Sequence, residues 1–489
     1  MSNNASESTP LLRRQHSSTT DHAHDALKAE TPFSFKDFRR FIGPGFMIGV
    51  GYLDPGNWAT DLAAGSQFGY SLLYIVLAAT IMAMVLQYLC IKLGTVTGND
   101  LAMACRKHFN PQANLALFIL CELAIIATDL AEVVGTAIAL NLLFSIPLPV
   151  GVALTSLDVL IVLMFWGAKH LKTYEKGVMA LIGLVAICFV YLLGVAKPVW
   201  VDVMWGFVPS AGIVRQEGQL YIAMAIIGAT IMPHNLYLHS SIVRYRSHAG
   251  EFGEIVELPP QKQILCSTEE NTQPLKRMTF LPQYIRYANI DSIVALTGAL
   301  LINSAILIVA GSAFSGDGEV GEIQDAYYLL KKHLGPLAAF SFALALFCAG
   351  QSSTITGTLC GQIVTEGFLG PSIKFQPAVQ RLLTRVLAIV PAMAAALYGG
   401  ESGMNDLLVM SQVMLSLQLP FAVWPLVWIT GGAEGDAMKV TFKGNVEDGQ
   451  GDESVVVDYA NSNGLKRVAF AIAVVITLFQ VILVYKTFY

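Results

Sequence analysis

The sequence is poor in charged residues. Asp, Glu, Lys and Arg make up 13% of its 489 residues, whereas hydrophobic residues make up 54%. A soluble globular domain has about 25% charged residues. This shortage, together with a mean hydropathy of +0.57, excludes a large soluble domain and indicates an integral membrane protein.

The sequence also lacks several motifs that define other protein classes. It has no GxxxxGK[ST] phosphate-binding loop, so we do not expect ATP to drive it. No nucleophile has a recognisable base partner, which argues against an enzyme. Its seven cysteines show no paired spacing, so we interpret them as small core residues rather than disulfides or thiolate ligands. We predict no resident cofactor and no nucleic-acid partner.

Long apolar segments dominate the chain. We expect an all-α integral membrane protein with about eleven spans. They are predicted at 41–68, 71–95, 114–144, 148–167, 176–196, 219–243, 284–312, 335–361, 382–399, 404–430 and 465–487. A short surface helix is expected at 325–333. The connections 244–283 and 432–464 are rich in charge, Gly, Pro or Gln, and we expect them to be mobile loops.

Two of these spans, the first and the sixth, contain helix-breaking residues. The interruptions are Gly-Tyr-Leu-Asp-Pro-Gly-Asn at 51–57 and Gly-Ala-Thr-Ile-Met-Pro-His-Asn at 228–235. Proline removes a backbone donor, and glycine has no side chain to hold a helix. Broken backbone at membrane depth is tolerated only inside protein or beside a water-filled cavity. Because Asp54 adds a charge there, we predict a cation site between two broken helices.

The residues around the breaks offer a mixed set of metal ligands. The candidates are the side chains of Asp54, Asn57, Met232 and Gln412 and the carbonyl groups of Gly51 and Ala229. Oxygen alone would suit Mg²⁺ or Ca²⁺, whereas a thioether shifts the preference toward Mn²⁺, Fe²⁺, Co²⁺ and Cd²⁺. The alternatives stay open: Met232 as core filler, Gln412 as an interhelical hydrogen-bonding group and Asp54 as a salt-bridge partner.

Further ionisable residues occur within the spans. They are Glu122, Asp129, Glu132, His234, His239 and Arg385. Asp129 and Glu132 are three residues apart and therefore share a helix face. Histidine and buried carboxylates can exchange protons near neutral pH. We predict a proton route from Asp54 through His234 to Asp129, Glu132 and Arg385. The alternatives are a static ion-pair network and, for His239, a packed and hydrogen-bonded histidine.

The basic residues are distributed unevenly between the two sides of the predicted spans. Most of the 30 lie on the side of the amino terminus, which the positive-inside rule assigns to the cytosol. Spans one to five and six to ten then form two inverted five-helix repeats, because five is odd. The predicted organisation is a tail at 1–40, repeats at 41–196 and 219–430, a cytosolic loop at 431–464 and a last span with the carboxyl terminus at 465–489.

The polar amino-terminal tail has no cleavable signal peptide and is expected to be disordered. Within it, Glu7-Ser-Thr-Pro-Leu-Leu12 resembles an acidic dileucine sorting signal read by adaptors. The alternative is an inert tail. The expected location is the plasma membrane or an endosomal, vacuolar or lysosomal membrane, and we expect a monomer.

Five pieces of the sequence together resemble the natural resistance-associated macrophage protein (Nramp) family of divalent metal transporters. In chain order they are Asp54-Pro-Gly-Asn57, the run from Glu122 through Asp129 to Glu132, Met232-Pro-His-Asn235, Leu383-Thr-Arg385 followed by Ile389-Val-Pro391, and Ser411-Gln412 through Pro420. The resemblance covers about residues 40–430. It implies a LeuT-like fold and uptake of Mn²⁺ or Fe²⁺ toward the cytosol, usually with protons, by alternating access.

The resemblance also assigns roles to single residues. It makes Asp54, Asn57, Met232, Gln412 and the Ala229 carbonyl metal ligands, and it places His234, Asp129, Glu132 and Arg385 on the proton route. Met232 is present, whereas family members adapted to harder ions lack it. Two rival hypotheses are a sodium-coupled amino-acid transporter of the same architecture, which Asp54 and Met232 oppose, and a metal sensor that uses the transporter fold. The sequence does not rank Mn²⁺ against Fe²⁺.

Overall fold

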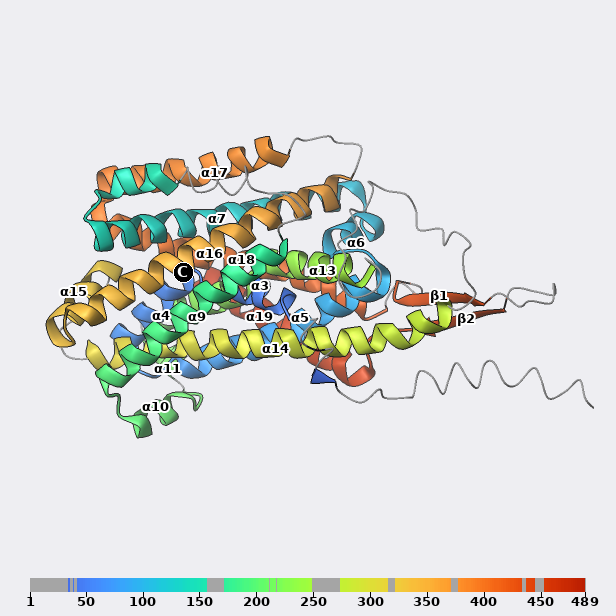
Figure 1. Cartoon of the computed structure of the whole chain (residues 1–489), viewed down its shortest axis with the longest axis horizontal. Helices are drawn as coiled ribbons and strands as arrows, with labels where there is room; N and C mark the ends of the chain where they lie inside the picture. Colours follow the sequence, from blue (N-terminus) through green and yellow to red (C-terminus); the bar gives the residue numbers. More distant parts are fainter. Residues whose placement is uncertain are drawn as a thin grey trace, which may run out of the picture.

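The protein is an elongated bundle of helices, most of which run along the long axis of the molecule (Figure 1). The structure, a computed structural model, describes residues 34–35, 38, 42–155, 171–210, 212–216, 218–248, 273–314, 322–370, 377–432, 437–444 and 453–488. Nearly all of the predicted tail at 1–40, including the sorting signal from Glu7 to Leu12, lies outside these residues.

The first half of the chain supplies the helices predicted for spans one, two, three and five. Its helices are α3 (Pro44–Gly51), α4 (Pro55–Phe68), α5 (Leu73–Thr97), α6 (Leu101–His108), α7 (Pro111–Phe144), α9 (Leu171–Ala196), α10 (Trp200–Gly206) and α11 (Gly212–Arg215). The predicted span 148–167 is helical over 148–155, and its remainder lies outside the described residues.

The second half supplies the helices predicted for spans six to eleven and the predicted surface helix. Its elements are α12 (Gln219–Ile231), α13 (Pro233–His248), α14 (Gln273–Ala313), α15 (Ile323–His333), α16 (Pro336–Leu369), α17 (Pro377–Ala394), the π-helical turn η3 (Ala395–Gly399), α18 (Gly400–Thr430), β1 (Lys439–Gly444), β2 (Glu453–Asp458) and α19 (Asn463–Phe488). The predicted surface helix is α15, which buries Ile323, Ala326 and Leu330 on one face.

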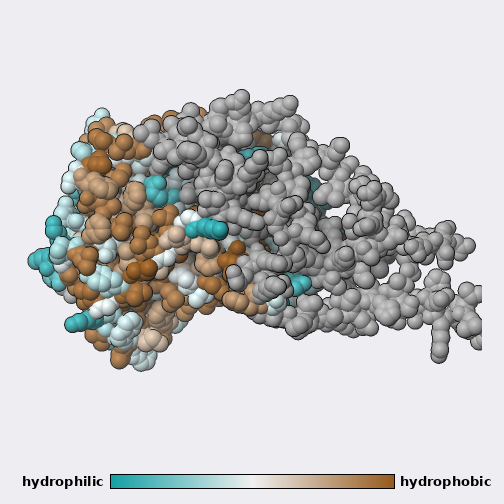
Figure 2. All heavy atoms as spheres, viewed as in Figure 1, coloured by the Kyte–Doolittle hydropathy of each residue, from teal (hydrophilic) through white to brown (hydrophobic). Residues whose placement is uncertain are grey.

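Burial divides the helices into an inner and an outer set. Seven helical stretches of the described chain are long and apolar enough to cross a membrane. In the most apolar part of Gln219–Arg244, 94% of the residues are buried, against 28% in Asn463–Tyr485. Apolar side chains also gather on the face shown in Figure 2, over the end of the bundle that carries α9 and α15. The interrupted sixth span is therefore enclosed by protein, while α19 exposes apolar surface to the surroundings.

Both predicted helix breaks are confirmed. The helix α3 ends at Gly51 and α4 begins at Pro55, with the Asp54 carboxylate accepting a 2.8 Å bond from the Asn57 amide as the N-cap of α4. Pro55 occupies the first turn, where its missing N–H costs nothing. In the sixth span α12 ends before Met232, whose φ of +40° takes it out of the helical region.

The two long connections were predicted wrongly as loops along their whole length. The helix α13 continues to His248 and α14 begins at Gln273, so helix covers both ends of 244–283. Lys, Arg and Gln are good helix formers, which is why a polar composition did not end these helices. Within 432–464, β1 pairs with β2 as an antiparallel hairpin in which Val457 faces Val440. The run of valines at 455–457 favours such a strand.

Candidate functional site

The two helix breaks meet at the side chain of Asn57. Its Nδ2 donates to Asp54 Oδ1 at 2.7 Å and to the Ala229 carbonyl at 3.0 Å, and it lies 3.5 Å from the Gly51 carbonyl. Asp54 and Ala229 are fully buried, and Asn57 is 1% exposed. Four of the predicted ligands therefore converge on one point, although Ala229 is 172 residues from Asn57 in the sequence.

Gln412 reaches this point from α18. A Cβ atom on Gly56 would lie 2.0 Å from Gln412 Nε2, and one on Gly228 would lie 2.3 Å from the Gln412 carbonyl oxygen. Glycine at 228 lets the backbone of α18 approach the second break this closely, and glycine at 56 leaves room for the end of the Gln412 side chain beside the first break. Gln412 Nε2 donates to Ser411 Oγ at 3.0 Å, while its buried Oε1 has no hydrogen-bond partner among the described residues. That oxygen is free to act as an additional ligand.

Met232 joins the same group through Asn235. Its side chain is fully buried, and its sulfur lies 3.5 Å from Asn235 Nδ2. A Cβ atom on Gly51 would in turn lie 2.3 Å from Asn235 Nδ2. The side-chain amide of Asn235 therefore lies between the Met232 thioether and Gly51 at the end of α3. All six residues predicted as ligands belong to one continuous cluster.

The chemistry of this cluster is a carboxylate with neutral oxygens and one sulfur. Asp54 Oδ2 is buried and has no hydrogen-bond partner within the described chain. No group of three or more His, Cys, Asp or Glu residues that could hold a metal occurs in the described part of the structure. A cation bound here would meet the negative charge of Asp54 and the dipoles of neutral groups. Such a site suits an ion that must also leave.

Sequence reasoning missed Asn303, which supports the first break. From α14 its Nδ2 donates to the Tyr52 carbonyl at 2.8 Å, and it lies 3.5 Å from Asn57 Oδ1. The Tyr52 carbonyl lies between α3 and α4, where no helical partner is available. The only signal in the sequence was a single carboxamide within an apolar span, and Gln87, Asn141 and Gln480 carry the same signal.

A second buried cluster surrounds Arg385. Its Nη1 lies 3.6 Å from Glu132 Oε2 and 3.9 Å from Asp129 Oδ1, and its Nη2 donates to the Thr155 carbonyl at 3.1 Å. Ser353 on α16, which sequence reasoning missed, donates to Glu132 Oε1 at 2.6 Å. The structure thus brings together the three charged residues that the sequence grouped.

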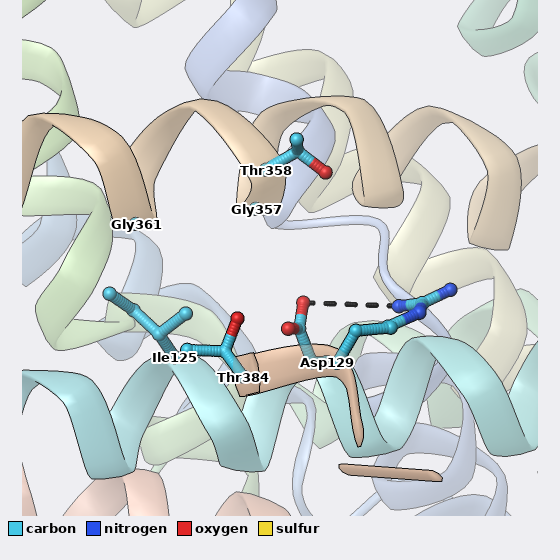
Figure 3. A pocket seen from close by; sticks show the side chains of 7 residues that line it. Ile125, Asp129, Gly357, Thr358, Gly361 and Thr384 are labelled. Carbon is cyan, nitrogen blue, oxygen red and sulfur yellow. Dashed lines mark ion pairs between the residues drawn. The ribbon is translucent and has the colours of Figure 1, made fainter. Parts of the chain in front are cut away.

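A small cavity adjoins this cluster. Its volume of about 10 Å³ is room for roughly one water molecule. Figure 3 shows Asp129 and Ile125 on one helix facing Gly357 and Thr358 on another, with the ion pair to Asp129 drawn as a dashed line. Asp129 and Arg385 both line the cavity, whereas Glu132 does not, so Asp129 is the carboxylate of the cluster that can meet water there.

The two histidines beyond the second break differ in their surroundings. His234 Nδ1 lies 3.4 Å from the hydroxyl of Thr128, the residue before Asp129, so His234 stands between the break and the Arg385 cluster. His239 Nδ1 is 2.8 Å from Gln87 Oε1, and Gln87 Nε2 donates to the Tyr52 hydroxyl at 2.9 Å. This geometry favours the alternative of a packed, hydrogen-bonded His239.

Comparisons with known proteins agree on one family. Residues 45–435 match the family described as natural resistance-associated macrophage protein-like. The chain is 45% identical over 462 residues to the divalent metal cation transporter MntH of Listeria welshimeri, covering 93% of this chain and 92% of that protein. It is 48% identical over 416 residues to the MntH of Brucella suis, covering 83% and 85%.

Solved structures agree as well. The manganese transporter of Eremococcus coleocola matches with a TM-score of 0.73 and 32% identity, over 93% of this chain and 88% of that one. A nucleobase-cation-symport transporter, Mhp1, matches with a TM-score of 0.52 at 17% identity, over 79% and 78%, and supports the fold alone. The predicted all-α, LeuT-like membrane fold with broken first and sixth helices is confirmed.

Proposed function

This chain belongs to the natural resistance-associated macrophage protein family, and we propose that it imports divalent transition metal ions, Mn²⁺ or Fe²⁺, into the cytosol together with protons. The observation that carries the proposal is the meeting of the two helix breaks. The Asp54 carboxylate and the Ala229 carbonyl lie within 3.0 Å of the same Asn57 nitrogen, fully enclosed by protein.

The ligand set supports a transition metal rather than a hard cation. Asp54 supplies the charge, Gln412 and the carbonyls of Gly51 and Ala229 supply neutral oxygen, and Met232 supplies the sulfur. Asn57 would supply its Oδ1 once a metal ion takes the place that its Nδ2 occupies beside Asp54 and Ala229. A thioether binds Mn²⁺ and Fe²⁺ better than it binds Mg²⁺ or Ca²⁺. The relatives described as divalent metal cation transporters and as a manganese transporter are consistent with this choice.

The Arg385 cluster supports proton coupling. On the proposed route, metal binding favours the charged form of Asp54, and the proton it releases passes His234 toward Asp129 and Glu132. His234 lies beside Thr128, which adjoins Asp129 on α7. Glu132 is fully buried and Asp129 borders a water-sized cavity, so the route leads from a dry part of the protein to a wetter one.

Alternating access would follow from the short half-helices. The helix α3 has eight residues and α12 has thirteen, and each ends at the metal cluster. Such half-helices can tilt about the breaks while longer helices stay in place. We propose that the repeats at 41–196 and 219–430 supply one moving helix each, with the amino terminus in the cytosol.

Reconstitution into liposomes tests the proposal. Purified protein is placed in liposomes that contain a metal-quenched dye and a pH dye, and Mn²⁺ entry is followed with and without an inward proton gradient. We expect Mn²⁺ entry accompanied by internal acidification, both lost in Asp54→Ala. Mn²⁺ entry at the same rate with and without the proton gradient would contradict proton coupling and would leave the Arg385 cluster with a structural role. No entry from folded protein would contradict import itself.

A further inference from the structure

The amino-terminal end of α3 is capped by a residue from a different helix. Its N-cap residue, Gly43, has a φ of +147° and no side chain to offer, and Pro44 follows it. The Asp291 carboxylate of α14 accepts bonds from the Gly45 amide at 2.7 Å and from the Gly43 amide at 3.3 Å. Helix amino termini carry unpaired N–H groups and attract negative charge. The Asp291 carboxylate accepts hydrogen bonds from N–H groups at this terminus and places a negative charge beside it.

Two glycines place α3 directly against α14. A Cβ atom on Gly45 would lie 2.6 Å from the backbone of Asp291 and Ser292, and one on Gly49 would lie 3.2 Å from the Ala295 side chain. Gly45 and Gly49 are one turn apart on α3, and their partners Asp291 and Ala295 are one turn apart on α14. This close seam fixes the position of α3 along α14 and aligns its amino terminus with the Asp291 carboxylate.

The segment before α3 is held one turn earlier on the same helix. The Tyr287 hydroxyl accepts a 3.0 Å bond from the Ser34 amide, and its ring centroid is 6.2 Å from that of Phe38. Asp291 is fully buried and Tyr287 is 1% exposed. Two described residues on the approach to α3, Ser34 and Phe38, thus contact α14 one turn before the buried Asp291 carboxylate.

The other end of α3 is Gly51, whose carbonyl belongs to the metal cluster. The helix is therefore a short lever with the cluster at one end and Asp291 at the other. We propose that Asp291 is a positioning residue that keeps α3 where it closes the metal cluster to the cytosol. Metal release then requires the amino terminus of α3 to separate from Asp291. This assignment rests on the orientation in the proposed function.

Hydrogen exchange measured by mass spectrometry tests the assignment on the full-length protein in lipid nanodiscs. The variants are Asp291→Ala, Asp291→Asn, which keeps one acceptor oxygen, and the control Thr297→Ala. Thr297 is an exposed residue of α14 whose hydroxyl bonds to its own helix. We expect peptides covering 43–51 to exchange about tenfold faster in Asp291→Ala, which corresponds to a loss of about 1.4 kcal/mol. The increase in exchange rate should be smaller in Asp291→Asn. The control should exchange at the rate of the parent protein.

Transport gives a second measurement. A protein biased toward the cytosol-open state presents its outward-facing site less often, so the KM for external Mn²⁺ should rise about tenfold in Asp291→Ala. Unchanged exchange over 43–51 would overturn the assignment. Faster exchange spread over many helices would also overturn it, because that result describes a residue of the general fold. Exchange needs no transport, so it separates this assignment from the failure of metal import.

Discussion

The protein buries two carboxylates in contrasting surroundings. Glu132 lies 3.6 Å from the Arg385 guanidinium and accepts a bond from the Ser353 hydroxyl. Asp54 is equally buried, but its nearest polar contacts are the amide groups of Asn57. Because a buried charge is costly unless paired, the protein supplies a fixed cation to one carboxylate. On our proposal, a travelling metal ion serves the other. On our proposal, the difference between a fixed and a travelling counter-charge is what separates the role of Glu132 from that of Asp54.

Removing the fixed cation should have the largest effect. In Arg385→Ala, Glu132 and Asp129 would remain buried without it, which should lower the free energy of unfolding by about 3–5 kcal/mol. Thermal melting of the purified protein measures the loss. Lys331→Ala, at an exposed position on α15, is the control and should melt like the parent. A melting temperature equal to that of the control would mean that the two carboxylates do not depend on Arg385.

Removing the other carboxylate should abolish transport rather than folding. Asp54→Ala deletes the only anionic ligand of the cluster, so Mn²⁺ uptake should fall at least about 100-fold, which corresponds to ~2.8 kcal/mol. Metal-quenched dye in liposomes measures uptake, and the melting temperature checks the fold. The matched control is Asp325→Ala, an exposed carboxylate on α15. Residual uptake within a few-fold of the parent would remove Asp54 from the metal site.

Changing the sulfur should alter selectivity more than rate. Met232→Ala should leave Mn²⁺ uptake measurable while weakening the exclusion of Ca²⁺ and Mg²⁺ about tenfold, because the remaining ligands are all oxygen. Competition between Mn²⁺ and excess Ca²⁺ in the liposome assay measures the change. Equal loss for every ion, or exclusion of Ca²⁺ as strong as before, would count against the role of the thioether.

The smallest effect should come from the hydroxyl that shares Glu132 with Arg385. Ser353→Ala removes one hydrogen bond and should lower the free energy of unfolding by about 1 kcal/mol, with Ser353→Thr restoring most of it. Denaturation midpoints compare the two variants. The control is Ser352→Ala, whose hydroxyl bonds only to the Ala349 carbonyl of its own helix among its described contacts. Identical losses at 352 and 353 would show that the Glu132 contact contributes nothing specific.

The parts of the site that could be predicted are those whose signal is local. Pro55, Pro233 and the flanking glycines interrupt apolar runs, so both breaks were visible in the sequence. The three-residue spacing of Asp129 and Glu132 placed them on one helix face. The spans themselves follow from the length and apolarity of each segment.

The parts that could not be predicted depend on partners far away in the chain. Ser353 bonds to a residue 221 positions earlier, and Asp291 caps a helix 246 positions earlier. A single polar residue in an apolar helix carries no sign of which neighbour it meets. The hairpin β1–β2 was missed for a related reason, since each strand is stable only when its partner is present.

At Met232 the backbone conformation favours glycine, whereas the proposed metal site needs the methionine sulfur. Its φ of +40° is a conformation that glycine adopts freely, whereas a side chain there costs about 1–3 kcal/mol of strain. Replacement by glycine would therefore relieve the strain and delete the sulfur in a single step. In evolutionary terms, and on our proposal, selection for soft metals keeps a methionine at this position despite the strain. The residue found at this position would then record the ions that a lineage has been selected to carry.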